Sequence, residues 1–304
     1  MPTKKGAFKI FSLFGITVFV HWSWFLVAVY SIQYRTHSYS SMTWNALEYL
    51  SLFLIVLLHE FGHQLACRQV GGKTHDIVLW PLGGVAYVSP PQRPGAQLWS
   101  IAAGPLVNVV LIPILSVLVS VSSHLGWYDS HPDAYDLIHN IWWINVAILI
   151  FNMMPVYPLD GGQILRSLLW FVFGRANSLI IASIIGFAGV AGLILIAVLL
   201  QSIWLGIMAV FILLKCWRGL THARALARLA KLPRRGGFAC PDCKASPPCG
   251  EIWLCGKCGG KFDTFATQGI CPHCQATFTT TQCSDCGTSR PIQEWIVSAP
   301  ASNG

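Results

Sequence analysis

The residues of this sequence with the clearest capacity for chemistry are two histidines and a glutamate in the segment LLHEFGHQLACR. His59 and His63 are four positions apart, so in a helix both imidazoles lie on one face. Two neutral imidazoles can bind a divalent metal, and Glu60 between them can reach a water on that metal without being a ligand itself. The spacing is that of the HExxH zinc motif. The alternative is a pair of interior histidines that hydrogen-bond across helices.

A third metal donor is expected elsewhere, because a catalytic zinc ion normally has three protein ligands and a water. Asp160 is the candidate, in the segment FNMMPVYPLDGGQ. Pro155 and Pro158 each lack an amide proton and interrupt a helix just before this acid. In the alternative, Asp160 only caps the helix that follows near Gly161 and Gly162.

Cysteine marks a second chemical region, since nine of the eleven cysteines fall between positions 240 and 286. Eight of them form four CxxC pairs: Cys240 and Cys243, Cys255 and Cys258, Cys271 and Cys274, Cys283 and Cys286. Eight thiolates suffice for two tetrahedral structural zinc sites. If neighbouring pairs combine, the tail forms two zinc ribbons in tandem, but the spacing leaves the pairing open. Disulfides are the alternative, which a reducing compartment would disfavour.

The elements that must position these residues are membrane helices. The chain is 54% hydrophobic and 11% charged, against about one-quarter charged in soluble globular proteins. Six apolar runs have about the length that a bilayer requires, and they lie at 12–31, 45–66, 98–122, 140–157, 178–200 and 202–217. We expect an α-helical multi-pass membrane domain over 1–236, with its first run a retained anchor, and a small β domain over 237–304. Gly236 and Gly237 are expected to form a flexible joint.

Charge predicts the orientation of the spans. The net charge is +8, and the basic excess lies beside the apolar runs, which is typical of cytoplasmic loops. With both termini in the cytoplasm, the loops at 67–97 and 158–177 are internal, whereas the opposite loops at 32–44 and 123–139 hold Arg35 as their single basic residue. No basic stripe with interleaved aromatics is found on the tail, so no nucleic-acid partner is expected.

This membrane setting bears on the two alternatives for the histidines. An ionised side chain in hydrocarbon costs several kcal/mol or more. Of the twelve acids, only Glu60 and Asp160 lie inside a predicted span or just after one with no evident way to reach water, since Glu48 can lie at the edge of its span. A metal site gives both acids a reason to be there. A metal site is therefore favoured over a pair of interior histidines that only hydrogen-bond across helices.

The motifs HEFGH and NMMPVYPLDGG together resemble those of the site-2 protease family of intramembrane zinc metalloproteases. GITVFVHWSW, WPLGGVAY and AAGPLVN are similar to further family segments, and the resemblance covers about residues 10–220. Only 96 residues separate His63 from Asp160, so the chain resembles the compact branch without a PDZ insert. The cysteine-rich tail departs from that pattern, which leaves the mode of control open.

The resemblance implies a function and a role for each matched residue. His59, His63 and Asp160 match the zinc ligands, Glu60 the catalytic glutamate, and Asn152 a motif asparagine that orients the substrate carbonyl, stabilises the oxyanion or simply bonds a neighbouring helix. The resemblance implies one catalytic zinc ion, and the cysteine pairs of the tail add the expectation of two structural ones. The substrates would be single-span membrane proteins. The β-favouring segment 75–90 would either form an edge that holds an extended substrate, as the family suggests, or be an ordinary re-entrant loop or hairpin packed on the bundle.

Two functions from other classes stay open. Histidine and acid pairs on membrane helices also line ion pathways, so a metal-ion transporter is possible in principle, although it would repeat donors along several spans. A catalytically inactive, membrane-tethered zinc-ribbon adaptor is the other. In either protease or adaptor, the tail is expected to bind a cytoplasmic regulator or recruit substrate.

Overall fold

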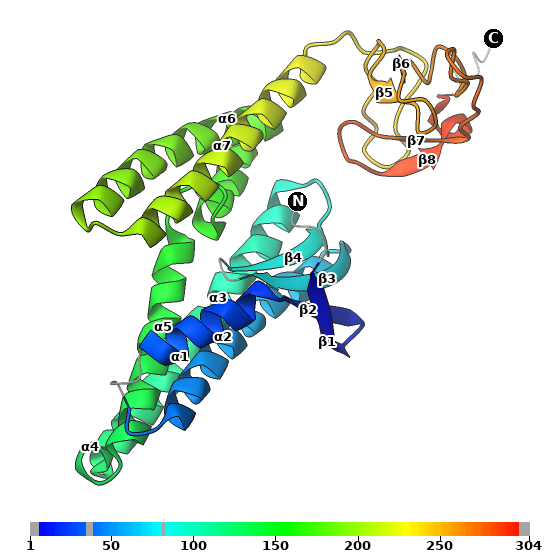
Figure 1. Cartoon of the computed structure of the whole chain (residues 1–304). Helices are drawn as coiled ribbons and strands as arrows, with labels where there is room; N and C mark the ends of the chain where they lie inside the picture. The colour runs from blue at the N-terminus through cyan, green and yellow to red at the C-terminus, as the bar shows by residue number, and fades with distance from the viewer. Residues whose placement is uncertain (1–5, 35–38, 81–82, 298–304) are drawn as a thin grey trace, which may run out of the picture. The chain divides into compact units, whose positions relative to one another are not determined.

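The computed structural model describes residues 6–34, 39–80 and 83–297 and separates into two compact units (Figure 1). One unit comprises Met1–Pro90 with Pro94–Leu220, and the other comprises Pro91–Arg93 with Thr221–Gly304. The predicted boundary at residue 236 falls within the second unit. The assignment of domains stays a prediction.

Five helices of the described residues are long and apolar enough to cross a membrane. They are α2 (Met42–Gln69), α3 (Pro94–His124), α5 (Pro132–Met153), α6 (Asp160–Leu199) and α7 (Ile203–Ala230), and a single turn, α4 (Trp127–Ser130), joins α3 to α5. The predicted helical membrane fold is confirmed. Five of the six predicted spans correspond to these helices.

The first predicted span, 12–31, is wrong. Its residues contribute to two strands, β1 (Ala7–Leu13) and β2 (Ile16–His21), and to a helix, α1 (Ser23–Tyr34), of 12 residues. Such a helix is about 18 Å long, shorter than a hydrocarbon core of about 30 Å. Alternating β-branched and aromatic residues in ITVFVH favour a strand, and Gly15 at φ 72° turns the chain back between the strands.

The N-terminal strands belong to a four-stranded sheet of order β1-β2-β3-β4. The segment expected to be β-favouring forms β3 (Lys73–Trp80) and β4 (Gly83–Ser89) as an antiparallel pair. β2 runs antiparallel to β1 and parallel to β3, with Phe19 opposite Val78. Among the described residues, no strand pairs with β4 on the side away from β3, so β4 forms an edge of the sheet.

The core of the first unit lies between this sheet and α2. Ile16 and Val18 from β2 and Ile77 from β3 are fully buried, and they cluster with Leu57 and Phe61 from α2. The sheet thus fixes α2, which carries the HExxH motif.

α6 consists of two helical parts. Its first part begins at Asp160, and Gly174, with φ 75° and ψ 172°, breaks the helical geometry. The predicted loop 158–177 is therefore helical over most of its length. The predicted span 178–200 corresponds to the part of α6 after Gly174.

The tail contains two small antiparallel strand pairs. β5 (Trp253–Leu254) pairs with β6 (Lys261–Phe262), and β7 (Thr280–Gln282) pairs with β8 (Ser289–Pro291) before a short 3-10 turn over Ile292–Trp295. Aromatic side chains pack around the cysteines in two clusters. The most buried is Trp295, 1% exposed, which the sequence did not single out.

The expected flexible joint at Gly236 and Gly237 is also wrong. The Arg235 amide donates to the Pro247 carbonyl, and the Gly237 carbonyl accepts from the Val297 amide. These hydrogen bonds make the double glycine part of the folded tail. Gly237 has φ 77°, so it serves a turn that glycine favours.

Candidate functional site

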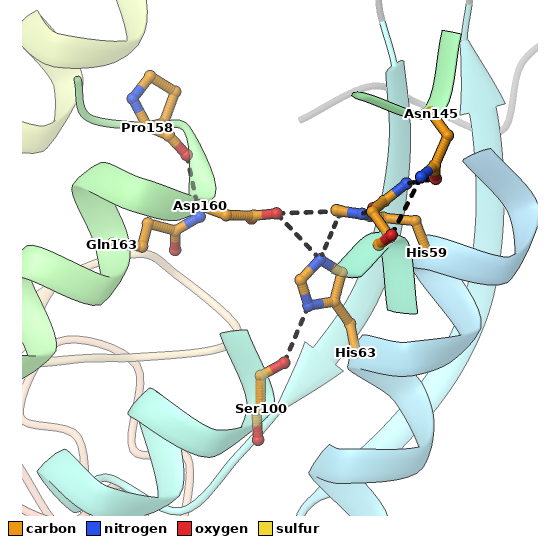
Figure 2. A network of polar contacts seen from close by, with 8 residues as sticks. His59, His63, Ser100, Asn145, Pro158, Asp160 and Gln163 are labelled. Atoms are coloured by element: carbon orange, nitrogen blue, oxygen red, sulfur yellow. Dashed lines mark hydrogen bonds and ion pairs between the residues drawn. The ribbon is translucent and has the colours of Figure 1, made fainter. Parts of the chain in front are cut away.

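The structure brings His59, His63 and Asp160 together although the first and the last are 101 positions apart in the sequence. Asp160 Oδ2 lies 3.0 Å from His59 Nε2 and 3.4 Å from His63 Nε2, and the two Nε2 atoms are 3.1 Å apart. Figure 2 shows the carboxylate pointing at both rings. Around a tetrahedral zinc ion, with bonds near 2.0 Å, donor atoms lie about 3.3 Å apart, so the triangle has the size of a zinc site.

Hydrogen bonds on the far side of each ring test whether a metal fits. His63 Nδ1 is 2.9 Å from the Ser100 carbonyl, which can only accept, so the ring carries its proton there. His59 Nδ1 is 2.6 Å from Asn108 Oδ1. Both Nε2 atoms are then acceptors facing a carboxylate oxygen, and three acceptors this close repel unless a cation or proton lies among them. The donor set therefore fits zinc.

Local sequence explains how Asp160 reaches the rings. Leu159 is the N-cap of α6 and makes no side-chain cap bond, and Asp160 itself turns to the histidines. A Cβ at Gly161 would overlap the Met153 carbonyl, and one at Gly162 would overlap the Tyr157 amide. The two glycines thus let the start of α6 lie against the preceding turn. The capping alternative does not describe the position of this carboxylate.

Glu60 and Asn152 line the same cavity as the three donors. The cavity has a volume of about 1060 Å³ and also borders Gly84 of β4. Glu60 is 7% exposed, and a Cβ on Gly84 would overlap its carboxyl group. Asn152 lies near the end of α5 on the cavity wall. His21, by contrast, stacks on Trp80 with ring centroids 3.8 Å apart and is not in the group of metal donors.

The sequence analysis missed three residues that support the histidines. A Cβ on Gly104 would lie 2.8 Å from His59 Nε2, so only glycine leaves the space between the rings open. Asn108 and Asn145 are fully buried and bond each other behind His59. An amide within an apolar span is a signal that could have found them, because such a group needs a partner in lipid.

The cysteines form two separate clusters in the tail. Cys240 and Cys243 meet Cys283 and Cys286, which enclose the second cluster in sequence, namely Cys255, Cys258, Cys271 and Cys274. The order is nested, so neighbouring pairs do not combine, and of the pairings that the sequence left open the sequential one is excluded. CxxC spacing is local and does not encode which knuckles meet.

The sulfur geometry fits metal rather than disulfides. Cys240 Sγ lies 3.7 Å from Cys286 Sγ, and Cys255 Sγ lies 3.6 Å from Cys274 Sγ. A disulfide requires about 2.05 Å, whereas sulfurs around a tetrahedral zinc ion lie about 3.8 Å apart. His273 bonds the Lys261 carbonyl and is in neither cluster.

The thiols of a cluster also influence one another. The backbone amides of Cys258 and Lys257 lower the pKa of Cys255 to about 6. The Ala276 amide acts in the same direction on Cys274, but burial and the neighbouring sulfurs raise its pKa to about 12. Four thiolates cannot gather without a cation, so each cluster fits a metal ion.

A helical membrane unit with an HExxH helix facing a distant aspartate has the type of site found in membrane zinc metalloproteases. The profile of peptidase family M50 matches residues 47–141 and 130–196. This chain belongs to that family, the site-2 proteases. Between His63 and Asp160 the described residues form β3, β4 and α3 to α5, with no PDZ domain among them.

Known proteins agree with this assignment. A zinc metalloprotease of Methanocaldococcus jannaschii is 31% identical over 206 residues, covering 67% of this chain and 58% of that protein. A putative zinc metalloprotease of Synechocystis is 33% identical over 190 residues, covering 59% and 48%. The chain thus spans about half the length of these relatives. The solved site-2 protease from M. jannaschii superposes with a TM-score of 0.51 at 26% identity, over 70% of this chain and 95% of that one.

Proposed function

We propose that this protein is an intramembrane zinc metalloprotease that hydrolyses peptide bonds within or near transmembrane segments of single-span membrane proteins. The observation that carries the proposal is the triangle of His59, His63 and Asp160 donor atoms, all within 3.4 Å of one another beside a cavity that Glu60 lines. Three protein ligands leave a fourth position open, which is the arrangement of catalytic zinc.

Glu60 is proposed as the general base and acid. Bound zinc would supply Lewis-acid activation of water and of the scissile carbonyl. Glu60 borders the same cavity and is not one of the three metal donors, so we assign its carboxylate the role of accepting the proton of the attacking water. It would then deliver that proton to the leaving nitrogen as the peptide bond breaks.

The edge of the sheet is proposed to hold the substrate. A helical substrate hides its peptide bonds in its own hydrogen bonds, so it must become extended before water can attack. β4 is the last strand of the sheet, and its Gly84 lies against Glu60. A substrate strand added to this edge would pass beside the base. Asn152, near the end of α5 on the cavity wall, would orient the substrate carbonyl.

The tail is proposed to hold two structural zinc ions and to bind a cytoplasmic regulator or recruit substrate. Each cluster offers four thiolates and no open position. Such closed sites stabilise a fold and do not activate water. The small aromatic cores around the cysteines are consistent with a domain that depends on metal.

Both termini are proposed to be cytoplasmic. The pairing of β2 with β3 supports a position of the N-terminal strands on the same side as the segment between α2 and α3. Because α2 is one crossing, this arrangement requires that the stretch between β2 and α2, which contains α1, supplies a second one. From that segment the chain makes four crossings, through α3, α5, the second part of α6, and α7, and returns to the same side. Basic residues beside these ends favour the cytoplasm.

The test uses the purified full chain with single-span substrates in detergent or vesicles, with and without a chelator, beside the Glu60→Gln variant. The proposal expects cleavage that stops with chelator, returns with zinc and is absent in the variant. Cleavage insensitive to chelator would reject the zinc mechanism. Transport of a divalent ion into sealed vesicles without any cleavage would instead favour the transporter, and neither activity would favour the adaptor.

A further inference from the structure

Two buried asparagines behind the metal site have no part in the function proposed above. Asn108 on α3 and Asn145 on α5 are both 0% exposed. Figure 2 shows Asn145 on the side of His59 away from Asp160. Buried amides between apolar helices are costly unless every polar atom is bonded, so the direction of each bond can be followed.

The direction is set by a backbone carbonyl. The backbone carbonyl of Asn108 can only accept, so Asn145 presents its side-chain Nδ2 to this oxygen, at 3.0 Å. Asn145 Oδ1 therefore faces Asn108 and accepts from Asn108 Nδ2, at 2.8 Å. This in turn leaves Asn108 Oδ1 to face His59 Nδ1, at 2.6 Å. His59 Nδ1 must donate, and the lone pair of His59 Nε2 is directed at Asp160.

The two histidines are thus held by different means. His63 Nδ1 bonds the Ser100 backbone carbonyl, whose polarity no substitution of a side chain can reverse. The polarity at His59 depends on two side-chain amides, either of which could flip if its partner were lost. Partners behind a metal-binding histidine fix its tautomer and raise its basicity.

We propose that Asn108 and Asn145 are positioning residues that hold His59 in the tautomer able to bind zinc, with Asn108 acting directly and Asn145 acting through Asn108. This inference rests on the proposed function, in which His59 is a zinc ligand.

The matched control lies on the same two helices. Trp142 Nε1 on α5 donates to Ser116 Oγ on α3 at 2.9 Å. Ser116→Ala removes a hydrogen bond between the same helices without touching the histidines. A purely structural role of the asparagines would make all three positions behave alike.

The experiment measures zinc retained by the full chain against a graded chelator series. The His59→Ala curve gives the zinc held elsewhere, and its difference from wild type gives the membrane site. Asn108→Leu is expected to weaken retention about 10- to 100-fold, whereas Asn108→Asp, which still accepts the His59 proton, keeps it. Asn145→Ala is expected to weaken retention less than Asn108→Leu. Asn145→Asp is expected to restore it, since a protonated carboxyl group, the form that burial favours, accepts from Asn108 Nδ2 and donates to the Asn108 backbone carbonyl. Ser116→Ala should match wild type.

The outcomes separate the two proposals. Identical curves for wild type and His59→Ala would contradict the proposed function, and the inference would fall with it. If these two differ but Asn108→Leu binds as wild type, or Asn108→Asp is as weak as Asn108→Leu, the inference alone is overturned. Should Asn108→Leu fail to fold, Asn145→Ala against Asn145→Asp decides by the same criterion.

Discussion

The two regions of this chain gather metal donors in opposite ways. In the membrane unit, three donors come from α2 and α6, and their geometry is imposed by packed helices and by bonds behind the rings. In the tail, two sets of four cysteines come from short turns with small cores between them. The comparison teaches that a scaffold which positions donors by itself can leave one metal position open for chemistry. A scaffold that needs the metal for its own stability must close the site.

Loss of one tail ligand should have the largest effect on stability. Cys240→Ala removes one of four sulfurs from the outer cluster, and metal binding supplies about 10 kcal/mol or more to small zinc domains. We expect the chain to lose one zinc equivalent and the tail to become protease-sensitive, while cleavage at the membrane site continues. Zinc content and limited proteolysis measure this. Cys249→Ala is the control, because Cys249 is in neither cluster; equal effects of the two would contradict a ligand role for Cys240.

Glu60→Gln should have the next largest effect, and only on the membrane site. Loss of a general acid–base group lowers rates about 10²- to 10⁴-fold, and Glu60 is not among the three donors, so zinc content should not change. Cleavage rate and zinc content are measured on the same preparation.

A second buried glutamate on α2 provides the control for that variant. Glu48 accepts a hydrogen bond from Tyr39, at 2.5 Å, and from Asn140, at 3.2 Å, outside the cavity. A glutamine at this position can still accept both. Glu48→Gln should therefore keep the wild-type rate, and a loss equal to that of Glu60→Gln would show that any buried carboxylate on α2 matters.

Gly84→Ala should have a smaller effect on the same base. The added Cβ would overlap the Glu60 side chain, and misplacing a catalytic group by about 1 Å can cost on the order of 100-fold in rate. Zinc content should stay at the wild-type value. Gly192→Ala is the control, since nothing lies within 4 Å of a Cβ there. A wild-type rate in Gly84→Ala would argue against a base beside the strand edge.

The smallest expected effect concerns an ion pair in the tail away from the metal. Asp263 is 9% exposed, and its Oδ2 atom lies 2.6 Å from Arg235 Nη2. Burial acts to raise the pKa of Asp263, but the amides of Gly250 and Ala266 together with the Arg235 charge lower it. The carboxylate is therefore ionised at neutral pH. Asp263→Asn should lower the free energy of unfolding of the zinc-loaded tail by roughly 1–3 kcal/mol.

The control for that variant is a more exposed pair. The Asp285 side chain is 38% exposed, and its Oδ2 atom lies 2.8 Å from Arg234 Nη1. Asp285→Asn should cost about 0–1 kcal/mol, as exposed ion pairs do. Denaturant unfolding at neutral pH with saturating zinc compares the two, and a larger loss for Asp285→Asn would reverse the ranking.

Much of the membrane site could be predicted from the sequence, because each of its two motifs is a short stretch of neighbouring residues. A four-residue spacing places His59 and His63 on one helix face by geometry alone. The position of Asp160 came from the cost of an acid in an apolar chain and from the resemblance of its motif. Asn108 and Asn145 could not be paired in this way, since their contact depends on how α3 and α5 pack.

The errors in the predicted fold have similar physical causes. An apolar run of strand residues such as ITVFVH has the hydropathy of a span, and only its pairing with β3 distinguishes the two. The nesting of the cysteine pairs likewise depends on contacts between distant turns. Gly236 and Gly237 have the composition of a linker, yet the hydrogen bond from the Val297 amide to the Gly237 carbonyl could not be foreseen from that composition.

The central claim is tested most directly by diffraction from crystals of the full chain at the zinc absorption edge. The account predicts three anomalous peaks, two within the cysteine clusters and one about 2.0–2.2 Å from His59 Nε2, His63 Nε2 and an Asp160 oxygen, with no fourth protein ligand. A map without the peak at the histidines, or with a fourth side chain closing that site, would contradict it.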